Sequence, residues 1–250
     1  MSISHSASSG IEAATTAKGS TSTTVAHVGT AAGRLAILMV TVKPDTATWG
    51  IDPSGWQQVV NTTGGTGTTG ADVGLTRLGI WWKVLLGNEG TSNVTITNSG
   101  GSATGGGMSV YAGTLGAWAN PIAVTGTDAA HGTGRTCVCG AWGSALAASD
   151  LVVIAHSSDT DAVGAVSAFT ITQTSATFGA TAIRNQRLSS SGNDCGLYSG
   201  DAAVTAGNAN APTIGFTYAT SQCGAGATVR LRELTPGATP SLVAARYGRR

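Results

Sequence analysis

The side chains best suited to bind a ligand in this sequence are its six tryptophans. A tryptophan that is exposed on a β-sheet can stack against a sugar ring. Trp49 and Trp81 fit this use best, because one lies in a predicted loop and the other on the polar face of a predicted strand. Their polar neighbours are few, namely Asp45, Asp52 and Gln57. Two interpretations stay open, a sugar platform and packing between sheets or subunits, and the scarcity of polar partners favours packing.

The four cysteines indicate buried thiols more than a metal site or a disulfide framework. Cys137 and Cys139 are two residues apart on a predicted strand. This spacing puts their Cα atoms about 6.5 Å apart, near the upper limit for a disulfide. Cys195 and Cys223 lie on different predicted strands, and a disulfide between them is the alternative that stays open. A zinc site is disfavoured, because paired C-x-x-C knuckles are missing.

Two acidic residues after a predicted strand are candidate ligands for a cation. Asp159 and Asp161 follow the strand that ends at His156, and loop carboxylates can share a calcium ion. The rest of a calcium-loop pattern, including its terminal glutamate, is absent. A solvated loop is therefore the favoured interpretation.

No segment has the spacing of a catalytic motif. The glycine-rich runs at residues 64–70 and 100–107 contain no lysine, which a phosphate-binding loop requires. Ser109 has Gly107 before it but Tyr111 after it, so it lacks the second glycine of a nucleophile elbow. We therefore predict no catalytic residue, no bound metal and no cofactor, and we expect that the protein is not an enzyme.

The composition disfavours several classes of protein. Only 10% of the residues are charged, against about 25% in an ordinary soluble domain, and the formal net charge is +1. A neutral chain lacks the electrostatic footprint of a nucleic-acid-binding protein. The longest apolar run, residues 35–40, is too short to span a membrane, and the polar N-terminal segment lacks the apolar core of a signal peptide. We therefore expect that the protein binds neither nucleic acid nor a membrane, and that it folds in a cytoplasm.

The elements that must position these side chains are strands. The 37 glycines and the many threonines disfavour long helices. Turn residues divide the chain into about a dozen predicted strands. Along residues 75–86 one face is apolar and the other carries Arg77, Trp81 and Lys83, as in a sandwich strand. We place the strands at residues 23–28, 34–42, 56–61, 75–86, 93–97, 108–111, 122–125, 136–141, 150–156, 169–173, 195–201, 213–218 and 228–234.

A weak internal repeat divides the chain into two similar halves. Residues 32–40 and 148–155 share a turn, one polar residue and a buried strand. Neither half is expected to bury a sheet alone, so we predict one all-β domain, a two-sheet antiparallel β-sandwich of jelly-roll type. The predicted boundaries are an N-terminal arm at 1–22, the sandwich at 23–234 with halves at about 23–115 and 135–234, and a C-terminal arm at 235–250.

The predicted C-terminal arm contains two prolines, which favour an extended chain, and side chains that would need a surface to contact. We expect the arms to dock on neighbouring subunits, and a return of the arm onto its own domain is the alternative. The residues expected to make inter-subunit contacts are Leu242, Val243, Tyr247, Arg249 and Arg250.

Six short segments combine turns, strands and one core tryptophan in a recognisable order. They are residues 32–38 (AGRLAIL), 54–59 (SGWQQV), 76–84 (TRLGIWWKV), 108–114 (MSVYAGT), 119–122 (ANPI) and 148–153 (ASDLVV). In this combination the chain resembles a family of virion structural proteins from tailed bacteriophages and their prophage relatives. The match spans about residues 23–234 and departs from the family around 189–210 and in the C-terminal arm. It implies a jelly-roll-like minor tail or head-decoration protein and no catalytic residue.

These observations predict a non-enzymatic structural component of a tailed-phage virion, as capsid decoration or cement or as a head–tail associated protein. Such a protein would be assembled in the bacterial host cytoplasm and located in the virion. Its expected partners are capsid or tail subunits and further copies of itself in a homo-oligomer. The alternative is a carbohydrate-binding module of a tail fibre or minor tail protein, which would recognise host surface glycans through Trp49 and Trp81.

Overall fold

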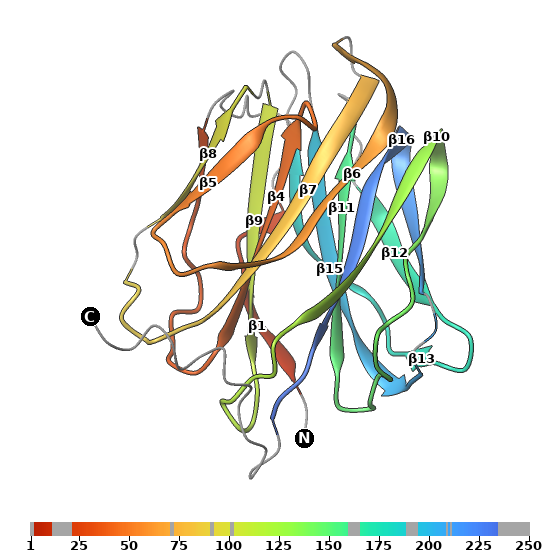
Figure 1. Cartoon of the computed structure of the whole chain (residues 1–250). Coiled ribbons are helices and arrows are strands. Elements are labelled where there is room, and N and C mark those ends of the chain that lie inside the picture. The colour runs from red at the N-terminus through yellow and green to blue at the C-terminus, as the bar shows by residue number, and fades with distance from the viewer. Residues whose placement is uncertain are drawn as a thin grey trace.

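A computed structural model of the chain describes residues 3–11, 22–70, 73–90, 93–100, 103–159, 166–188, 195–208, 210 and 212–234. These residues form sixteen strands and no helix, which confirms the predicted all-β sandwich class. The strands lie in stacked layers that follow one another from one side of the molecule to the other (Figure 1).

The first half of the chain forms an inner sheet of five strands. Their order is β1 (Ser4–Ser8), β9 (Ala103–Ala112), β4 (Leu35–Lys43), β7 (Val73–Val84) and β6 (Gln57–Gly70). All neighbours pair antiparallel. Every residue of β4 is buried, because this strand lies in the middle of the sheet and both of its faces are covered.

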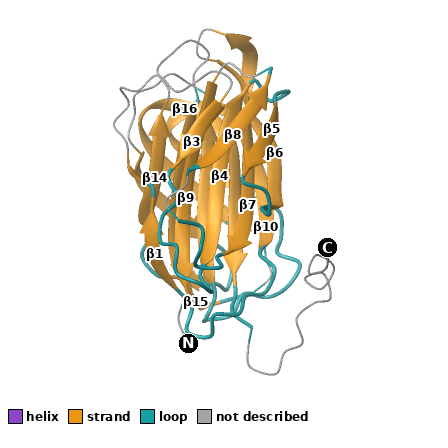
Figure 2. Ribbon diagram, turned by 90° about the vertical axis from the view of Figure 1, so that its left-hand side faces the viewer, coloured by secondary structure: helices purple, strands orange, loops and turns teal. Residues whose placement is uncertain are grey.

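A smaller sheet covers the outer face of this inner sheet. Its order is β3 (Ser22–Val25), β8 (Val94–Ser99) and β5 (Thr48–Asp52), and it faces the viewer in Figure 2. Burial alternates along β8, because Val94 and Ile96 face the inner sheet whereas Thr97 and Ser99 face outward. We call β3, β8 and β5 the first outer sheet.

The second half forms the other inner sheet. Its order is β10 (Ile122–Val138), β16 (Thr213–Leu231), β11 (Leu151–Ser158), β15 (Gly196–Ala206), β14 (Ala182–Leu188) and β2 (Gly10–Ile11), and the short β13 (Thr177–Phe178) pairs with β15. The long strands β10 and β16 pair along residues 122–128 of β10 and again along 134–138, after shifts of register. Residues 134–138, residues 213–218 and β12 (Val166–Thr172) form the second outer layer.

Both halves have the same strand order. In each, the first strand pairs with the last, β1 with β9 and β10 with β16, as in a jelly roll. The strands that contain the two similar sequence segments, β4 and β11, each lie between the last strand of their half and the next inner strand, β7 or β15. The sequence repeat therefore coincides with a repeat of topology.

Apolar side chains fill three cores between the layers. The central core joins the two inner sheets and includes Ile37 and Met39 of β4 with Val153 of β11. Leu38 and Val40, which point to the other face of β4, pack with Ile96 of the first outer sheet. In the second half, Val152 and Ile154 of β11 pack with Phe169, Ile171 and Ile214 of the outer layer.

This layering extends the predicted pair of facing sheets. The two inner sheets face each other, as expected. Each half also covers the other face of its inner sheet with an outer layer of its own, which was not expected. Residues 4–11 of the predicted N-terminal arm form β1 and β2, and β2 pairs in parallel with β14 of the second half. The predicted C-terminal arm, with Leu242, Val243, Tyr247, Arg249 and Arg250, lies outside the described residues.

Candidate functional site

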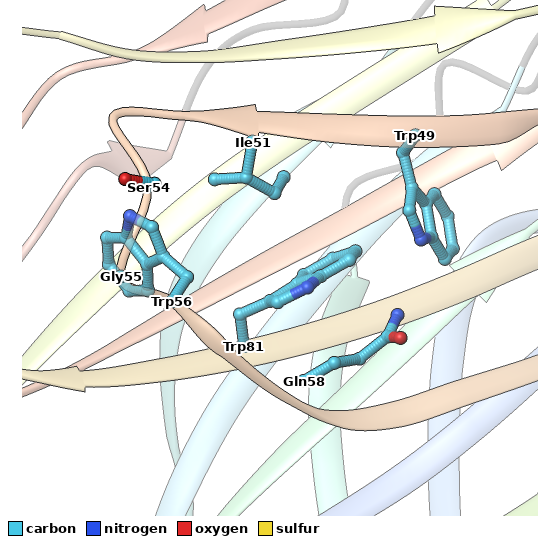
Figure 3. A pocket seen from close by; sticks show the side chains of 7 residues that line it. All are labelled: Trp49, Ile51, Ser54, Gly55, Trp56, Gln58 and Trp81. Carbon is cyan, nitrogen blue, oxygen red and sulfur yellow. The ribbon is translucent and has the colours of Figure 1, made fainter. Parts of the chain in front are cut away.

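A pocket lined by three tryptophans lies where the first outer sheet meets the first inner sheet (Figure 3). Its volume is about 290 Å³. Strand β5 and the turn after it supply one wall, and β6 and β7 supply the other. The lining residues are Trp49, Ile51, Ser54, Gly55, Trp56, Gln58 and Trp81.

Two of these tryptophan rings contact each other edge to face. The ring centroids of Trp49 and Trp81 are 5.1 Å apart, with an angle of 81° between the ring planes. The guanidinium carbon of Arg77 lies 4.9 Å from the centre of the Trp49 ring, a cation–π distance. Arg77 in turn donates hydrogen bonds of 2.7 Å to the Asn61 side chain and to the Ala47 carbonyl. Trp49 is therefore fixed from two sides.

Gly79 of β7 makes room for both rings. A Cβ atom at this position would lie 2.4 Å from Cη2 of Trp81 and 2.7 Å from Cζ2 of Trp49. These distances are far below van der Waals contact, so a larger residue would push the indoles off the strand. The glycine in the alternating pattern of residues 75–86 is thus a requirement of the tryptophan pocket.

The two tryptophans predicted from the sequence do lie together in the structure, but the other residues of the site differ from those predicted. Trp81 is 5% exposed, because the first outer sheet covers the face of β7 that was predicted to be partly polar. Asp45, Asp52 and Gln57 do not line the pocket, whereas Trp56, Ser54 and Gln58 do. The SGW segment at residues 54–56 is the sequence signal for this side of the site, and a glycine before a tryptophan is also what a purely structural turn would have.

The four cysteines are all buried and none of them is in a disulfide. The predicted alternative of a Cys195–Cys223 bridge is wrong, because β11 runs between β15 and β16: Gly196 pairs with Ser158, and Ser158 pairs with Gly224. Two strand spacings of about 4.8 Å exceed the reach of a disulfide. The hydrogen bond between Cys137 and Cys139 lowers the pKa of the Cys137 thiol and raises that of Cys139.

A buried polar cluster joins the ends of β4 and β11 to the middle of β16. The Lys43 ammonium donates to the Asp159 carbonyl at 2.7 Å, and the Cys223 thiol donates to the Asp159 carboxylate at 2.9 Å. Asp159 is fully buried, so the solvated-loop interpretation is wrong for this residue. Burial, and then the bond to Asp159, raise the pKa of the Cys223 thiol, which favours its protonated form.

The possible calcium site receives no support within the described part of the chain. No group of three or more histidine, cysteine, aspartate or glutamate side chains among those residues is placed to hold a metal ion. Asp161, the second carboxylate of the predicted pair, lies outside the described residues.

Another buried polar group connects the two inner sheets directly. The Tyr111 hydroxyl of β9 donates to the Asp201 carboxylate of β15 at 3.3 Å, and Arg184 of β14 donates to both oxygens of Asp201 at 2.7 and 2.9 Å. Burial, and next the Asp201 charge, raise the pKa of Tyr111 well above its usual value. The hydrogen bonds that Arg184 donates to Asp201 raise the pKa of Arg184, so the guanidinium stays charged.

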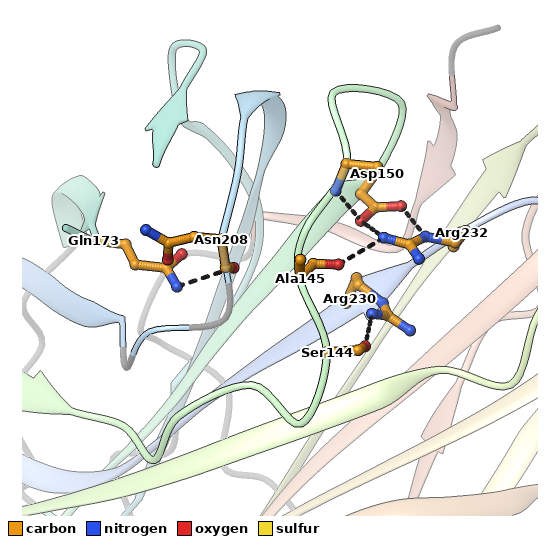
Figure 4. A network of polar contacts seen from close by, with 8 residues as sticks. Ser144, Ala145, Asp150, Gln173, Asn208, Arg230 and Arg232 are labelled. Atoms are coloured by element: carbon orange, nitrogen blue, oxygen red, sulfur yellow. Dashed lines mark hydrogen bonds and ion pairs between the residues drawn. The ribbon is translucent and has the colours of Figure 1, made fainter. Parts of the chain in front are cut away.

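A further ion pair fixes the turn before β11. Asp150 accepts two 2.6 Å hydrogen bonds from Arg232 and one of 2.8 Å from the Ala147 amide. Arg230 donates to Ser144 in the same group of contacts (Figure 4). The bidentate geometry stabilises the loop before β11 against the end of β16. Asp150 belongs to the ASDLVV segment, so this part of that motif has a structural role.

His156 makes the stability of the fold depend on pH. Burial, opposed by the charge of Asp128, lowers its pKa from 6.5 to about 3. Between these values the unfolded chain binds a proton that the folded chain does not, so stability is complete above pH 6.5 and falls as the pH drops toward 3. Between pH 7 and pH 5 we expect the free energy of unfolding of His156→Gln to fall by about 2 kcal/mol less than that of wild type.

Urea unfolding of both proteins at pH 7 and pH 5 measures this difference. The lowered pKa values of His5 and His27 contribute in the same direction in both proteins and cancel in the comparison. If wild type and His156→Gln lost the same free energy between the two pH values, the prediction would be contradicted.

The described residues include no helix long and apolar enough to cross a membrane. What the described side chains offer is a small aromatic pocket at the surface and buried polar groups whose hydrogen bonds tie the layers together. No family model, no curated protein and no solved structure matches this chain.

Proposed function

We propose that this chain is a non-enzymatic structural component of a tailed-bacteriophage virion, a capsid-decoration or head–tail associated protein that contacts neighbouring subunits. The support for a phage particle is the resemblance of six sequence segments. The support for a scaffold is the position of the two outer layers, which lie on opposite sides of the pair of inner sheets.

The first outer sheet presents an almost uncharged surface. Its strands alternate, and the side chains that point away from the core are hydroxyl-bearing residues and one glycine, with Asp52 as the single acidic residue at one end. The outward-pointing residues are Ser22, Thr24, Thr48, Gly50, Asp52, Thr95, Thr97 and Ser99.

The second outer layer repeats this chemistry on the far side of the molecule. Its outward-pointing residues carry no charge, and Val138 is 64% exposed. They are Gly134, Thr136, Val138, Ala168, Thr170, Thr172, Thr213, Gly215 and Thr217.

Two neutral faces on opposite sides are the observation that carries the proposal. Hydroxyl and glycine surfaces cost less free energy to remove from water than charged ones, so neighbouring subunits can cover them at low cost. The low net charge also limits repulsion between crowded copies. A body with one such face on each side can contact a neighbour on each side.

Size-exclusion chromatography with light scattering on the full chain tests the scaffold, and mass spectrometry of purified particles tests the virion. We expect an oligomer that Thr97→Lys or Thr217→Lys dissociates, since each places an ammonium on an outer face. Ala148→Lys, in an exposed turn away from both faces, is the matched control and leaves the oligomer intact. A chain that stays monomeric and is absent from particles would refute the proposal.

A further inference from the structure

The tryptophan pocket is open to solvent along one side. Ser54, Gly55 and Gln58 are exposed at its rim, and the rings of Trp49 and Trp56 are half-buried. Ile51 is half-buried as well, and Trp81, which is buried, lies deeper. In Figure 3 the Gln58 amide reaches toward the space between Trp49 and Trp81, and Trp56 lies on the other side of Trp81.

We propose that this pocket binds one neutral sugar residue of a glycan. The apolar face of a pyranose ring stacks on an indole, and the hydroxyl groups around the ring need partners that both donate and accept hydrogen bonds. The Gln58 amide and the Ser54 hydroxyl are such partners, and both are exposed beside the indoles. Aromatic walls with a few polar groups at the rim are the usual composition of a small-ligand site.

The charges around the pocket favour a neutral ligand over an anionic one. None of the seven lining residues is ionisable. The Arg77 guanidinium lies over the Trp49 ring, is not among the lining residues, and donates to Asn61 and Ala47, so two of its five N–H groups hold the wall. A sialic-acid carboxylate would find no charged partner among the lining residues.

The size of the pocket limits the ligand to one residue. Its volume of about 290 Å³ is just below the range of about 300–1,000 Å³ that is usual for ligand pockets. A terminal sugar fits this volume better than an internal stretch of a polysaccharide, which would need a longer groove.

The pocket is also built in advance. Two of the three indoles are fixed without a ligand, by the space at Gly79, the Trp49–Trp81 contact and the Arg77 hydrogen bonds. Little side-chain conformational entropy is therefore lost when a ligand binds. The buried Nε1 of Trp56 has no hydrogen-bond partner, and it lies at the Ser54 edge of the ring in Figure 3.

Titration of the full chain with trisaccharides tests the inference, with tryptophan fluorescence and saturation-transfer NMR as readouts. The probes are neutral trisaccharides that end in glucose, galactose, mannose or N-acetylglucosamine, and one that ends in sialic acid. We expect at least one neutral probe to bind with a Kd of about 1 mM. Trp49→Ala and Gln58→Ala should each weaken this binding about tenfold or more.

Gln173→Ala is the matched control, because Gln173 lines a different hollow, together with Thr172, Thr174 and Thr213. It should bind as wild type does. Gln58 is exposed, so its variant keeps the fold even if Trp49→Ala loses it. Binding that survives both variants, binding of the sialylated probe alone, or no binding at about tenfold higher concentrations would overturn the inference. Because the pocket needs no second subunit, these results are independent of the proposed scaffold role.

Discussion

Replacing Gly64 with alanine is expected to lower the free energy of unfolding by about 3 kcal/mol. Gly64 lies on β6 of the first half, and a Cβ atom there would come within 2.2 Å of the Gly224 carbonyl oxygen and 2.6 Å of the Ala225 nitrogen. Both atoms belong to the backbone of β16 in the second half. A backbone cannot rotate away as a side chain can, so the two inner sheets would have to separate locally.

Gly134→Ala is the matched control for this experiment. Gly134 is also on a long strand, but nothing lies within 4 Å of a Cβ atom at that position. Its replacement should change the free energy of unfolding by no more than about 0.5 kcal/mol. Urea unfolding of the two variants gives the comparison. Equal stabilities would show that β6 and β16 do not approach as closely as described.

The glycines that govern this contact illustrate what the sequence could reveal about the fold. Their number disfavours long helices, and the predicted strands leave residues 64–70 in the connection between residues 56–61 and 75–86. In the structure, Gly64 and Gly65 are buried within β6. A glycine that permits close approach of two strands has the same appearance in a sequence as a glycine in a turn, so only the partner strand distinguishes them.

Strands were predictable where their side chains are uniformly apolar. β4 and β11 were placed within a few residues, because strands covered on both faces need continuous runs such as residues 35–40. β14 was missed, because Arg184, Asn185 and Arg187 resemble a solvent-exposed segment. In the structure Asn185 is buried, and its side chain donates to Ser109 and Ser199. A buried polar network between halves has no apolar pattern to reveal it.

The candidate site was predictable in part for a related reason. Trp49 and Trp81 were predicted as site residues because they are large aromatic residues in polar segments, and in the structure their rings are in contact. Gln58 and Ser54 were not singled out, because exposed polar residues are common and only the geometry shows which of them flank an indole. Two strands of the outer sheet that buries Trp81 correspond to predicted strands, at residues 23–28 and 93–97, whereas its third strand, β5, lies in a predicted loop. The sequence pattern did not show that these strands form a separate layer over β7.

Asp201→Ala is expected to cost about 3 kcal/mol of the free energy of unfolding, for a different reason from Gly64→Ala. The Asp201 carboxylate is buried, and it accepts hydrogen bonds from Arg184 in its own half and from Tyr111 in the other. Removal of the carboxylate leaves a guanidinium that is 27% exposed and a fully buried phenol without their acceptor. Uncompensated buried polar groups are the source of the loss, more than the pair's own attraction.

A double-mutant cycle with Tyr111→Phe separates the contact between the halves from the ion pair within one half. Tyr111→Phe alone should cost about 1 kcal/mol, because it removes one hydrogen bond and keeps the ring in the central core. If the hydroxyl acts through Asp201, the double variant should be more stable than the sum of the two losses predicts, by about 0.5 to 1.5 kcal/mol. Strict additivity in urea unfolding would mean that Tyr111 and Asp201 do not interact. The two inner sheets would then be held together by apolar packing alone at this point, and the mutual orientation of the halves would have to be set elsewhere, at the Gly64 contact or at the Lys43–Asp159 cluster.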